Sequence, residues 1–233
     1  MKTMGNKYIA IAIAIIFSIG LTSCEATRNA NNKQKGAAIG AAGGAIIGAI
    51  IGNNVGKGGN GELGAVIGGV VGGGAGVLIG HKMDEQAKRI EEEIPGAEVE
   101  RVDQGIVVTF DENSGVYFDT EKYNINAASQ TTLNKLAAVL KDYPDTNVLV
   151  VGHTDSRGDE SYNMTLSKNR ANSVKDYFVQ QGLSASRFTT NWFGETQPKY
   201  DNNTVEGRAK NRRVNVAIVP NEDMIQEAKA NSN

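Results

Sequence analysis

The stretch from residue 148 to residue 171 places an aspartate and an arginine where both can face the same ligand. It reads VLVVGHTDSRGDESYNMTLSKNRA. A buried-strand signal over residues 148–151 ends at Gly152, a polar loop then carries Asp155, and the helix beyond it carries Arg170. Arginine binds a carboxylate through a planar pair of hydrogen bonds, and aspartate accepts hydrogen bonds from an ammonium group. The pattern therefore predicts a site for a small zwitterion, with an internal ion pair between the two residues as the alternative.

Histidine is too scarce to suggest a metal site. His153 follows the same strand, and the only other histidine, His81, lies in a different segment. A metal ion requires three or four convergent ligands. We therefore expect no metal, and we interpret His153 as a packing or hydrogen-bonding residue at the end of the strand.

The sequence gives little indication of a hydrolase active site. The chain contains no nucleophile elbow, and no Ser-His-Asp set can be assembled around its histidines. Four acidic residues could supply a carboxylate pair for glycan cleavage, namely Asp119, Asp155, Asp159 and Glu160. A binding site explains the arginine better, so we expect no enzyme activity and no cofactor.

A basic cluster near the C-terminus could suggest nucleic acid binding. It consists of Arg208, Lys210, Arg212 and Arg213. The 233-residue chain nevertheless has a net charge of -2 and a pI near 5.8, and no stacking aromatic residues are interleaved with the cluster. Composition therefore excludes a polyanion binder and fits one globular domain with additional segments.

The elements that must position these residues alternate between strand and helix signals. A hairpin over residues 97–102 and 106–110 leads into the domain. The expected elements are then a short strand at 116–118, a helix at 127–143 capped by Asn126, a strand at 147–151, a helix at 161–181, and strands at 188–193 and 213–219. This β-α-β-α-β-β order predicts an α/β (α+β) fold, a two-layer sandwich of about 110 residues with one hydrophobic core.

The N-terminal residues have the pattern of an export signal. Lys2 and Lys7 precede an apolar segment, residues 9–19, that is too short for a stable transmembrane helix. The sequence LTSC at 21–24 resembles the lipobox of bacterial lipoproteins, which implies a lipoprotein signal peptide over residues 1–23 and acylation of Cys24 with palmitate-like chains. An ordinary secretory peptide with an incidental cysteine is the alternative.

The residue after the lipobox indicates which membrane the protein is expected to reach. Glu25 follows Cys24, rather than the aspartate that favours inner-membrane retention in the best-known lipoprotein sorting system, so we expect the outer membrane. Two or more acyl chains make anchoring stable. Cys24 is also the only cysteine, which excludes an intramolecular disulfide.

Glycine is concentrated before residue 81. The chain has 28 glycines, and they recur at every fourth residue from Gly36 to Gly56 and again from Gly64 to Gly80. Ladders of this kind let two helices approach closely, and each uncharged ladder would be roughly 27–30 Å long, close to the thickness of a bilayer core. The pattern predicts a glycine-zipper helical hairpin at the membrane. A flexible spacer and a packing motif for a homo-oligomer are the alternatives.

Several separated motifs of the C-terminal half resemble the OmpA-like peptidoglycan-binding domain, which is shared by OmpA, the Pal lipoprotein and MotB. In chain order they are Phe118-Asp119, Gly152-His153-Thr154-Asp155, Asn163, Leu166-Ser167 with Arg170-Ala171, Gly194-Glu195, Glu206-Gly207-Arg208 and Asn211-Arg212-Arg213-Val214. The resemblance covers about residues 116–219. Together with the lipobox and the glycine ladders, it is similar to the YiaD type of outer-membrane lipoprotein.

The resemblance implies that the domain binds peptidoglycan without covalent chemistry, through the meso-diaminopimelate of the stem peptide. It assigns Asp155 to the ammonium group of this ligand and Arg170 to its carboxylate. Around them it places Thr154, Asn163, Leu166, Ser167, Arg208 and Arg213, and it leaves open which of Arg208, Arg212 and Arg213 reaches the ligand.

The expected organisation is a tether between the outer membrane and the cell wall. Its segments are a signal peptide (1–23), a lipidated flexible tether (24–35), the glycine-zipper hairpin (36–80), a charged helical linker (81–96), the periplasmic OmpA-like domain (97–220) and a polar tail (221–233). The expected function is envelope integrity. The alternative is an oligomeric, membrane-associated structural protein whose wall-binding domain is vestigial.

Overall fold

The computed structural model of the protein describes residues 73–111, 114–118 and 121–232. The expected signal peptide, Cys24, the tether and most of the glycine ladders lie outside these residues, as does Asp119. Within the described part, none of the helices combines the length and the apolar character that crossing a membrane requires.

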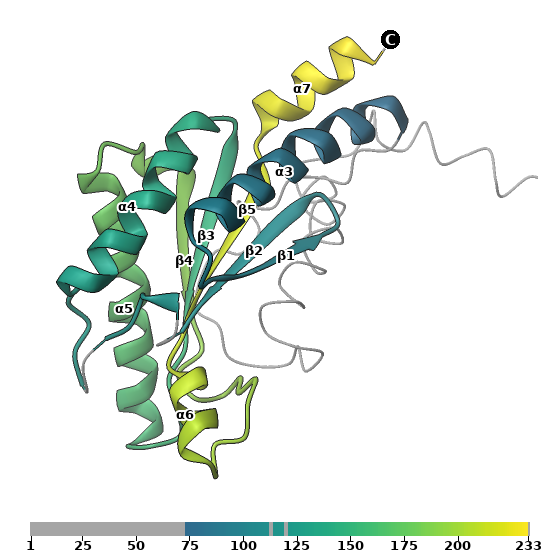
Figure 1. Cartoon of the computed structure of the whole chain (residues 1–233). Helices are drawn as coiled ribbons and strands as arrows, with labels where there is room; N and C mark the ends of the chain where they lie inside the picture. Colours follow the sequence, from purple (N-terminus) through teal and green to yellow (C-terminus); the bar gives the residue numbers. More distant parts are fainter. Residues whose placement is uncertain (1–72, 112–113, 119–120, 233) are drawn as a thin grey trace, which may run out of the picture. The chain divides into compact units, whose positions relative to one another are not determined.

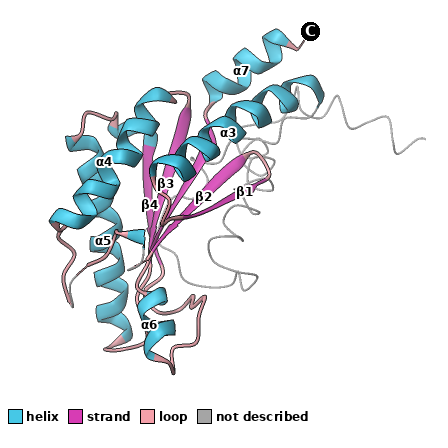
Figure 2. Ribbon diagram, in the orientation of Figure 1, coloured by secondary structure: helices cyan, strands magenta, loops and turns pink. Residues whose placement is uncertain are grey.

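Five strands form one sheet in the order β1-β2-β5-β3-β4 (Figures 1 and 2). They are β1 (Glu98–Val102), β2 (Gly105–Phe110), β3 (Thr146–Gly152), β4 (Phe188–Trp192) and β5 (Val214–Pro220). The pair β3 and β4 is parallel, and the other neighbours are antiparallel. Because β5 lies between β2 and β3, the residues that precede β5 are brought beside the residues that follow β3.

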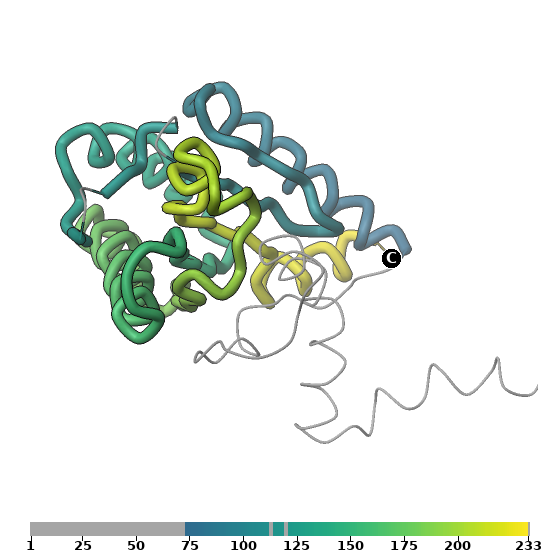
Figure 3. The backbone as a smooth tube through the Cα atoms, turned by 90° about the horizontal axis from the view of Figure 1, so that it is seen from below, coloured from purple at the N-terminus to yellow at the C-terminus, as the bar shows by residue number. Residues whose placement is uncertain are grey.

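Three long helices pack on one face of this sheet: α3 (Gly73–Glu93), α4 (Ala127–Asp142) and α5 (Glu160–Gln180), as Figures 1 and 3 show. Their buried apolar side chains form the main core with alternate residues of the strands, such as Val148, Val150 and Ile218. The two-layer α/β fold predicted from the sequence is therefore confirmed.

Residues 116–118, predicted as a short strand, are irregular instead. The carbonyl of Tyr117 accepts hydrogen bonds from Asn126 Nδ2 and from Ser129 Oγ, both at 2.9 Å, and the Tyr117 N–H donates to Ser129 Oγ at 3.1 Å. These side chains satisfy the backbone groups that a neighbouring strand would otherwise satisfy. The segment therefore passes from β2 to α4 without joining the sheet.

Residues 81–93 of the charged segment are helical, as predicted, but one face of this helix is buried. These residues belong to α3, which runs unbroken from Gly73 and so contains the last glycines of the second ladder. Ile79, Met83 and Ile90 are completely buried on this helix. Their spacing of four and seven residues places them on one face, which the many charged neighbours obscure in the sequence.

The expected polar tail is also a helix, α7 (Glu222–Asn231). Asn221 begins it, because its side chain accepts from the N–H of Met224 at 3.0 Å while its own N–H donates to the carbonyl of Asp145 at 3.0 Å. Met224 and Ile225 are buried. The helix lies beside α3 (Figure 1), so the C-terminal segment is part of the domain.

The strand β3 ends where its backbone touches α5. A Cβ atom at Gly152 would lie 2.2 Å from the carbonyl oxygen of Ser167, so no side chain fits there. The hydroxyl of Ser167 strengthens this junction, because it donates to the carbonyl of Met164 and accepts from the N–H of Gly194, each at 2.9 Å. Close packing of β3 on α5 thus sets the position from which the loop 153–159 departs.

We expect Gly152→Ala to destabilise the domain by about 3 kcal/mol or more, because the new methyl group meets a backbone carbonyl that can move only with α5. Gly80→Ala is the matched control. Nothing lies within 4 Å of a Cβ at Gly80 in α3, and alanine favours a helix by about 1 kcal/mol over glycine. Urea unfolding of both variants checks this, and an unchanged midpoint for Gly152→Ala contradicts it.

Candidate functional site

A pocket of about 800 Å³ lies where the loop after β3 meets the first turns of α5 and the short helix α6 (Val205–Asn211). Four guanidinium groups and three carboxylates are among its lining groups, so it suits a ligand that carries both signs of charge. The lining residues are Phe118, Glu121, Thr154, Asp155, Arg157, Gly158, Asp159, Tyr162, Asn163, Leu166, Arg170, Val205, Arg208 and Arg212.

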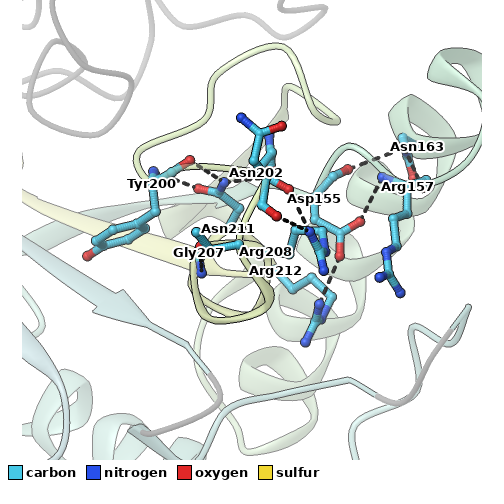
Figure 4. Close-up of polar contacts among 11 residues, drawn as sticks. Asp155, Arg157, Asn163, Tyr200, Asn202, Gly207, Arg208, Asn211 and Arg212 are labelled. Atoms are coloured by element: carbon cyan, nitrogen blue, oxygen red, sulfur yellow. Dashed lines mark hydrogen bonds and ion pairs between the residues drawn. The ribbon is translucent and has the colours of Figure 1, made fainter.

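Asp155 is held in the pocket by contacts to both carboxylate oxygens (Figure 4). Oδ1 accepts a hydrogen bond from the backbone N–H of Arg157 at 3.0 Å, and Oδ2 forms an ion pair with Arg212 Nη1 at 2.8 Å. The side chain of Asn163 braces the loop by donating to the carbonyls of Asp155 at 3.3 Å and Arg157 at 3.0 Å, and to the carboxylate of Glu195. The carboxylate therefore has a fixed position and is nearly buried.

The helix α5 begins beside this loop because Asp159 caps it. One carboxylate oxygen of Asp159 accepts from the N–H groups of Ser161 and Tyr162 and from the hydroxyl of Ser161. The hydroxyl of Ser161 is the main cause that lowers the pKa of Asp159. The cap fixes the start of α5 and so positions Asn163 and Arg170 along the pocket wall.

Arg170 is a buried charge, with 2% of its surface exposed. Its Nε donates to the carbonyl of Lys122 at 3.0 Å, and its guanidinium lies 5.0 Å from the ring centroid of Phe118. Aromatic faces stabilise a guanidinium in this geometry. Among the described residues, the ion-pair partner of Asp155 is Arg212, so the alternative of an internal pair between Asp155 and Arg170 is not what the structure contains.

The structure brings together six of the eight residues expected at the site: Thr154, Asp155, Asn163, Leu166, Arg170 and Arg208. Ser167 does not line the pocket, because its hydroxyl is directed into the junction between β3 and α5. Arg212, Arg157 and Tyr162 line the pocket although the expected set did not include them.

Arg213 also lies away from the pocket. Side chains alternate across a strand, and Arg213 precedes β5 on the side opposite to Val214. It is buried, and its Nη2 donates to the carbonyl of Gln197 at 3.1 Å, whereas Nε and Nη1 have no hydrogen-bond partner. Burial lowers the pKa of Arg213 to about 10. The alternation of side chains along β5 was the signal in the sequence that could have placed Arg212 and Arg213 on opposite sides of the sheet.

The loop before α6 is organised by Asn211, which is completely buried. Its Oδ1 accepts from the N–H groups of Lys199 and Tyr200 at 3.0 Å, and its Nδ2 donates to the carbonyl of Tyr200 and to Asn202 Oδ1 at 2.8 Å (Figure 4). Arg208 joins this network by donating to the carbonyl of Asn202 at 2.8 Å. The network places Arg208 at the pocket edge.

His153 occupies the opposite side of the sheet from Thr154. Its ring stacks on Phe193 with the centroids 5.8 Å apart, and neither ring nitrogen has a hydrogen-bond partner. Burial lowers the pKa of His153 well below its ordinary value, and the charge of Arg213 lowers it further. It therefore packs as a neutral ring. No group of three His, Cys, Asp or Glu residues in the described ranges is arranged to hold a metal.

Comparison with known proteins identifies the class to which this site belongs. Residues 117–212 match the OmpA family, and residues 1–84 match the YMGG-like Gly-zipper family. Each match covers less than half of the chain, and the OmpA match includes the pocket residues from Phe118 to Arg212. The resemblance to these two families that the sequence predicted is therefore confirmed.

The chain is similar to named relatives over part of its length. It is 37% identical over 142 residues to the probable lipoprotein YiaD of Escherichia coli, with 61% of this chain and 65% of YiaD covered. It is 44% identical over 103 residues to outer membrane porin F of Pseudomonas fluorescens, covering 44% of this chain and 32% of the porin. The chain thus spans less than two thirds of either relative.

A solved structure provides the same comparison for the fold. The cell wall anchor of the T6SS from Pseudomonas aeruginosa superposes with a TM-score of 0.51 at 28% sequence identity, covering 59% of this chain and 96% of that one. The fold described above is therefore similar to that of this cell wall anchor.

We expect His153→Phe to reduce the acid sensitivity of the fold. The unfolded chain binds a proton on His153 near pH 6.5, whereas the folded chain does not, so wild-type stability is full above about pH 6.5 and falls by up to about 1.4 kcal/mol per pH unit below it. Phenylalanine keeps the stacking on Phe193 and binds no proton. Unfolding free energies of both proteins at about pH 7 and about pH 5 check this; equal losses contradict it.

Proposed function

We propose that this chain is an outer-membrane lipoprotein whose OmpA family domain binds peptidoglycan non-covalently, through the diaminopimelate of the stem peptide. The observation that carries the proposal is the presence of Asp155 and Arg170 in one pocket. Diaminopimelate has a free amino acid centre at the end of its side chain. Asp155 would accept hydrogen bonds from the ammonium group of this centre, and Arg170 would pair with its carboxylate.

The remaining pocket residues suit the same ligand. Thr154, Asn163 and Arg208 supply polar groups, and Leu166 supplies an apolar wall for the methylene chain of diaminopimelate. Both key charges are nearly buried, so a ligand with an ammonium group and a carboxylate placed to match them should bind better than a ligand that lacks one of the two. The pocket should therefore prefer diaminopimelate to lysine-type stems, which lack the distal carboxylate for Arg170.

The position of the pocket suits a tether. The chain enters the domain through α3, and a Cβ at Gly74 would lie 3.2 Å from the Cβ of Ser232 at the end of α7. The helix α7 starts beside Asp145, just before β3, whereas the pocket lies beyond Gly152 at the other end of that strand. Seven strand residues separate these ends by roughly 23 Å. The pocket thus lies at the end of the domain opposite to the entry of the anchor segment.

The membrane side of the proposal rests on the N-terminal sequence and on the relatives. The lipobox ending at Cys24 and the Gly-zipper match suit a lipid-anchored protein, the names of two relatives refer to a lipoprotein and to the outer membrane, and a structural neighbour is a cell wall anchor. Anchoring near the wall would raise the local concentration of ligand. Envelope integrity is the function that such a tether serves.

Asp155→Asn and Arg170→Gln are each expected to weaken binding to purified sacculi by about 2–5 kcal/mol, because the partner charge of the ligand is left unpaired in a desolvated pocket. Co-sedimentation of the full-length protein in detergent measures this. Asp176→Asn and Lys168→Gln remove the same charges from α5 outside the pocket and are expected to bind like wild type. Folded variants at Asp155 and Arg170 that still bind would overturn this mechanism, whereas a folded wild-type protein that does not bind sacculi would support the alternative of a vestigial domain.

We propose further that the domain does not cleave its ligand. Purified sacculi incubated with the wild-type protein are expected to release no soluble muropeptides above the level of a buffer control. Release that disappears in Asp155→Asn would instead identify the pocket carboxylates as catalytic groups for glycan or peptide cleavage.

Cys24→Ser is expected to release the protein from the membrane, because no acyl chain can be attached to serine by the thioether route and the apolar signal segment is too short to anchor stably. Fractionation of cells into membrane and soluble periplasm measures the change. Ser23→Ala alters the neighbouring residue and keeps the acceptor thiol. Complete retention of Cys24→Ser in the membrane would mean that the glycine ladders anchor the chain without lipid.

A further inference from the structure

Both oxygens of the Asp155 carboxylate already have partners in the pocket. The N–H of Arg157 donates to Oδ1 at 3.0 Å, and Arg212 Nη1 contacts Oδ2 at 2.8 Å. We propose that Arg212 is an internal counter-ion that the ammonium group of the ligand replaces. The inference rests on the proposed function, since it describes how the zwitterion enters the pocket. Binding would thus exchange one cation for another at Asp155.

The two members of this ion pair differ in exposure. Asp155 has 9% of its side chain exposed and is fixed by the loop contacts, whereas Arg212 has 32% of its side chain exposed at the pocket surface. The long arginine side chain can leave by rotation about its own bonds. The carboxylate can therefore stay in place while its partner changes.

The backbone of Arg212 is held firmly, so the exchange involves only the side chain. Its N–H donates to the carbonyl of Arg208 at 3.1 Å, closing the end of α6. The residues on either side, Asn211 and Arg213, are buried and hydrogen-bonded to the loop 197–202. No movement of α6 or β5 is needed for Arg212 to release Asp155.

The exchange sets the affinity of the pocket as a difference between two ion pairs. A buried carboxylate without a partner is costly, so Arg212 stabilises the empty pocket and competes with the ligand. The binding free energy of a ligand is therefore reduced by the free energy needed to separate Arg212 from Asp155. Removing Arg212 should therefore destabilise the empty protein and increase the affinity for a cationic ligand.

The same exchange provides specificity. A ligand whose amine is neutral cannot take over the charge of Asp155, so it would either leave the Asp155–Arg212 pair in place or bury an unpaired carboxylate. The pocket should therefore reject the N-acetylated form of an otherwise identical ligand. Arg212 would act as a specificity-determining residue because it holds the site against molecules without a cationic centre.

Arg212→Gln in the full-length, detergent-solubilised protein tests the proposal, with meso-diaminopimelate as the probe in calorimetric titrations. We expect binding to tighten by about three- to tenfold, because the internal competitor is gone. Lys210→Gln is the matched control: Lys210 lies on α6 two residues before Arg212, pairs with Glu206 at 2.8 Å and does not line the pocket. It should bind within about twofold of wild type. Arg212→Lys, which retains a cation, should bind less tightly than Arg212→Gln.

Thermal unfolding separates this role from a merely structural one. Unliganded Arg212→Gln should unfold at a lower temperature than wild type, and saturating diaminopimelate should narrow the gap, since the ligand then supplies the missing cation. The exchange is overturned if diaminopimelate leaves the difference in unfolding temperature unchanged, or if Arg212→Gln binds it more weakly than wild type. Neither result would contradict diaminopimelate as the ligand. Failure of the wild type to bind diaminopimelate overturns the proposed function itself.

Discussion

The pocket depends on the pairing of β5 with β3, which joins two distant parts of the chain at one end of the sheet. Gly152 faces Val214 across this pair, and the N–H of His153 donates to the carbonyl of Arg213 at 3.0 Å. Because side chains alternate across strands, this register directs Arg212 towards Asp155 and sends His153 and Arg213 to the other side. A shift of one residue would reverse every one of these directions.

Among the described residues, three charged side chains are buried near this end of the sheet: Asp155, Arg170 and Arg213. The contacts of Asp155 include an ion pair with Arg212, those of Arg170 include the carbonyl of Lys122 and the face of Phe118, and Arg213 donates to the carbonyl of Gln197. Buried charges are poor sources of stability. Asp155 and Arg170 face the pocket. A ligand that carries both signs of charge could therefore offset part of the desolvation penalty of burying these two side chains.

Local signals were sufficient to predict most elements, and contacts between distant residues were not. The cap at Asn126 and the stop at Pro144 placed α4 within one residue of its observed end, and apolar runs located β3 and β5. By contrast, the basic cluster does not reveal which arginine reaches Asp155, since that depends on the register of β5. The helix α7 was missed because its few apolar residues are meaningful only beside α3, and the strand at 116–118 failed because Ser129 captures the backbone of Tyr117.

The burial of one face of α3 has a mechanical consequence. If the protein is the proposed tether it bears tension, and the pull would enter at Gly73 and leave through the pocket at the opposite end of the sheet. The force would then act along the axis of α3, whose 21 residues extend over about 30 Å. A force along the helix axis acts on the contacts of Ile79, Met83 and Ile90 at the same time. A force perpendicular to the axis would break these contacts one after another. In the proposed tether, the buried face of α3 would therefore resist extraction of this helix from the domain.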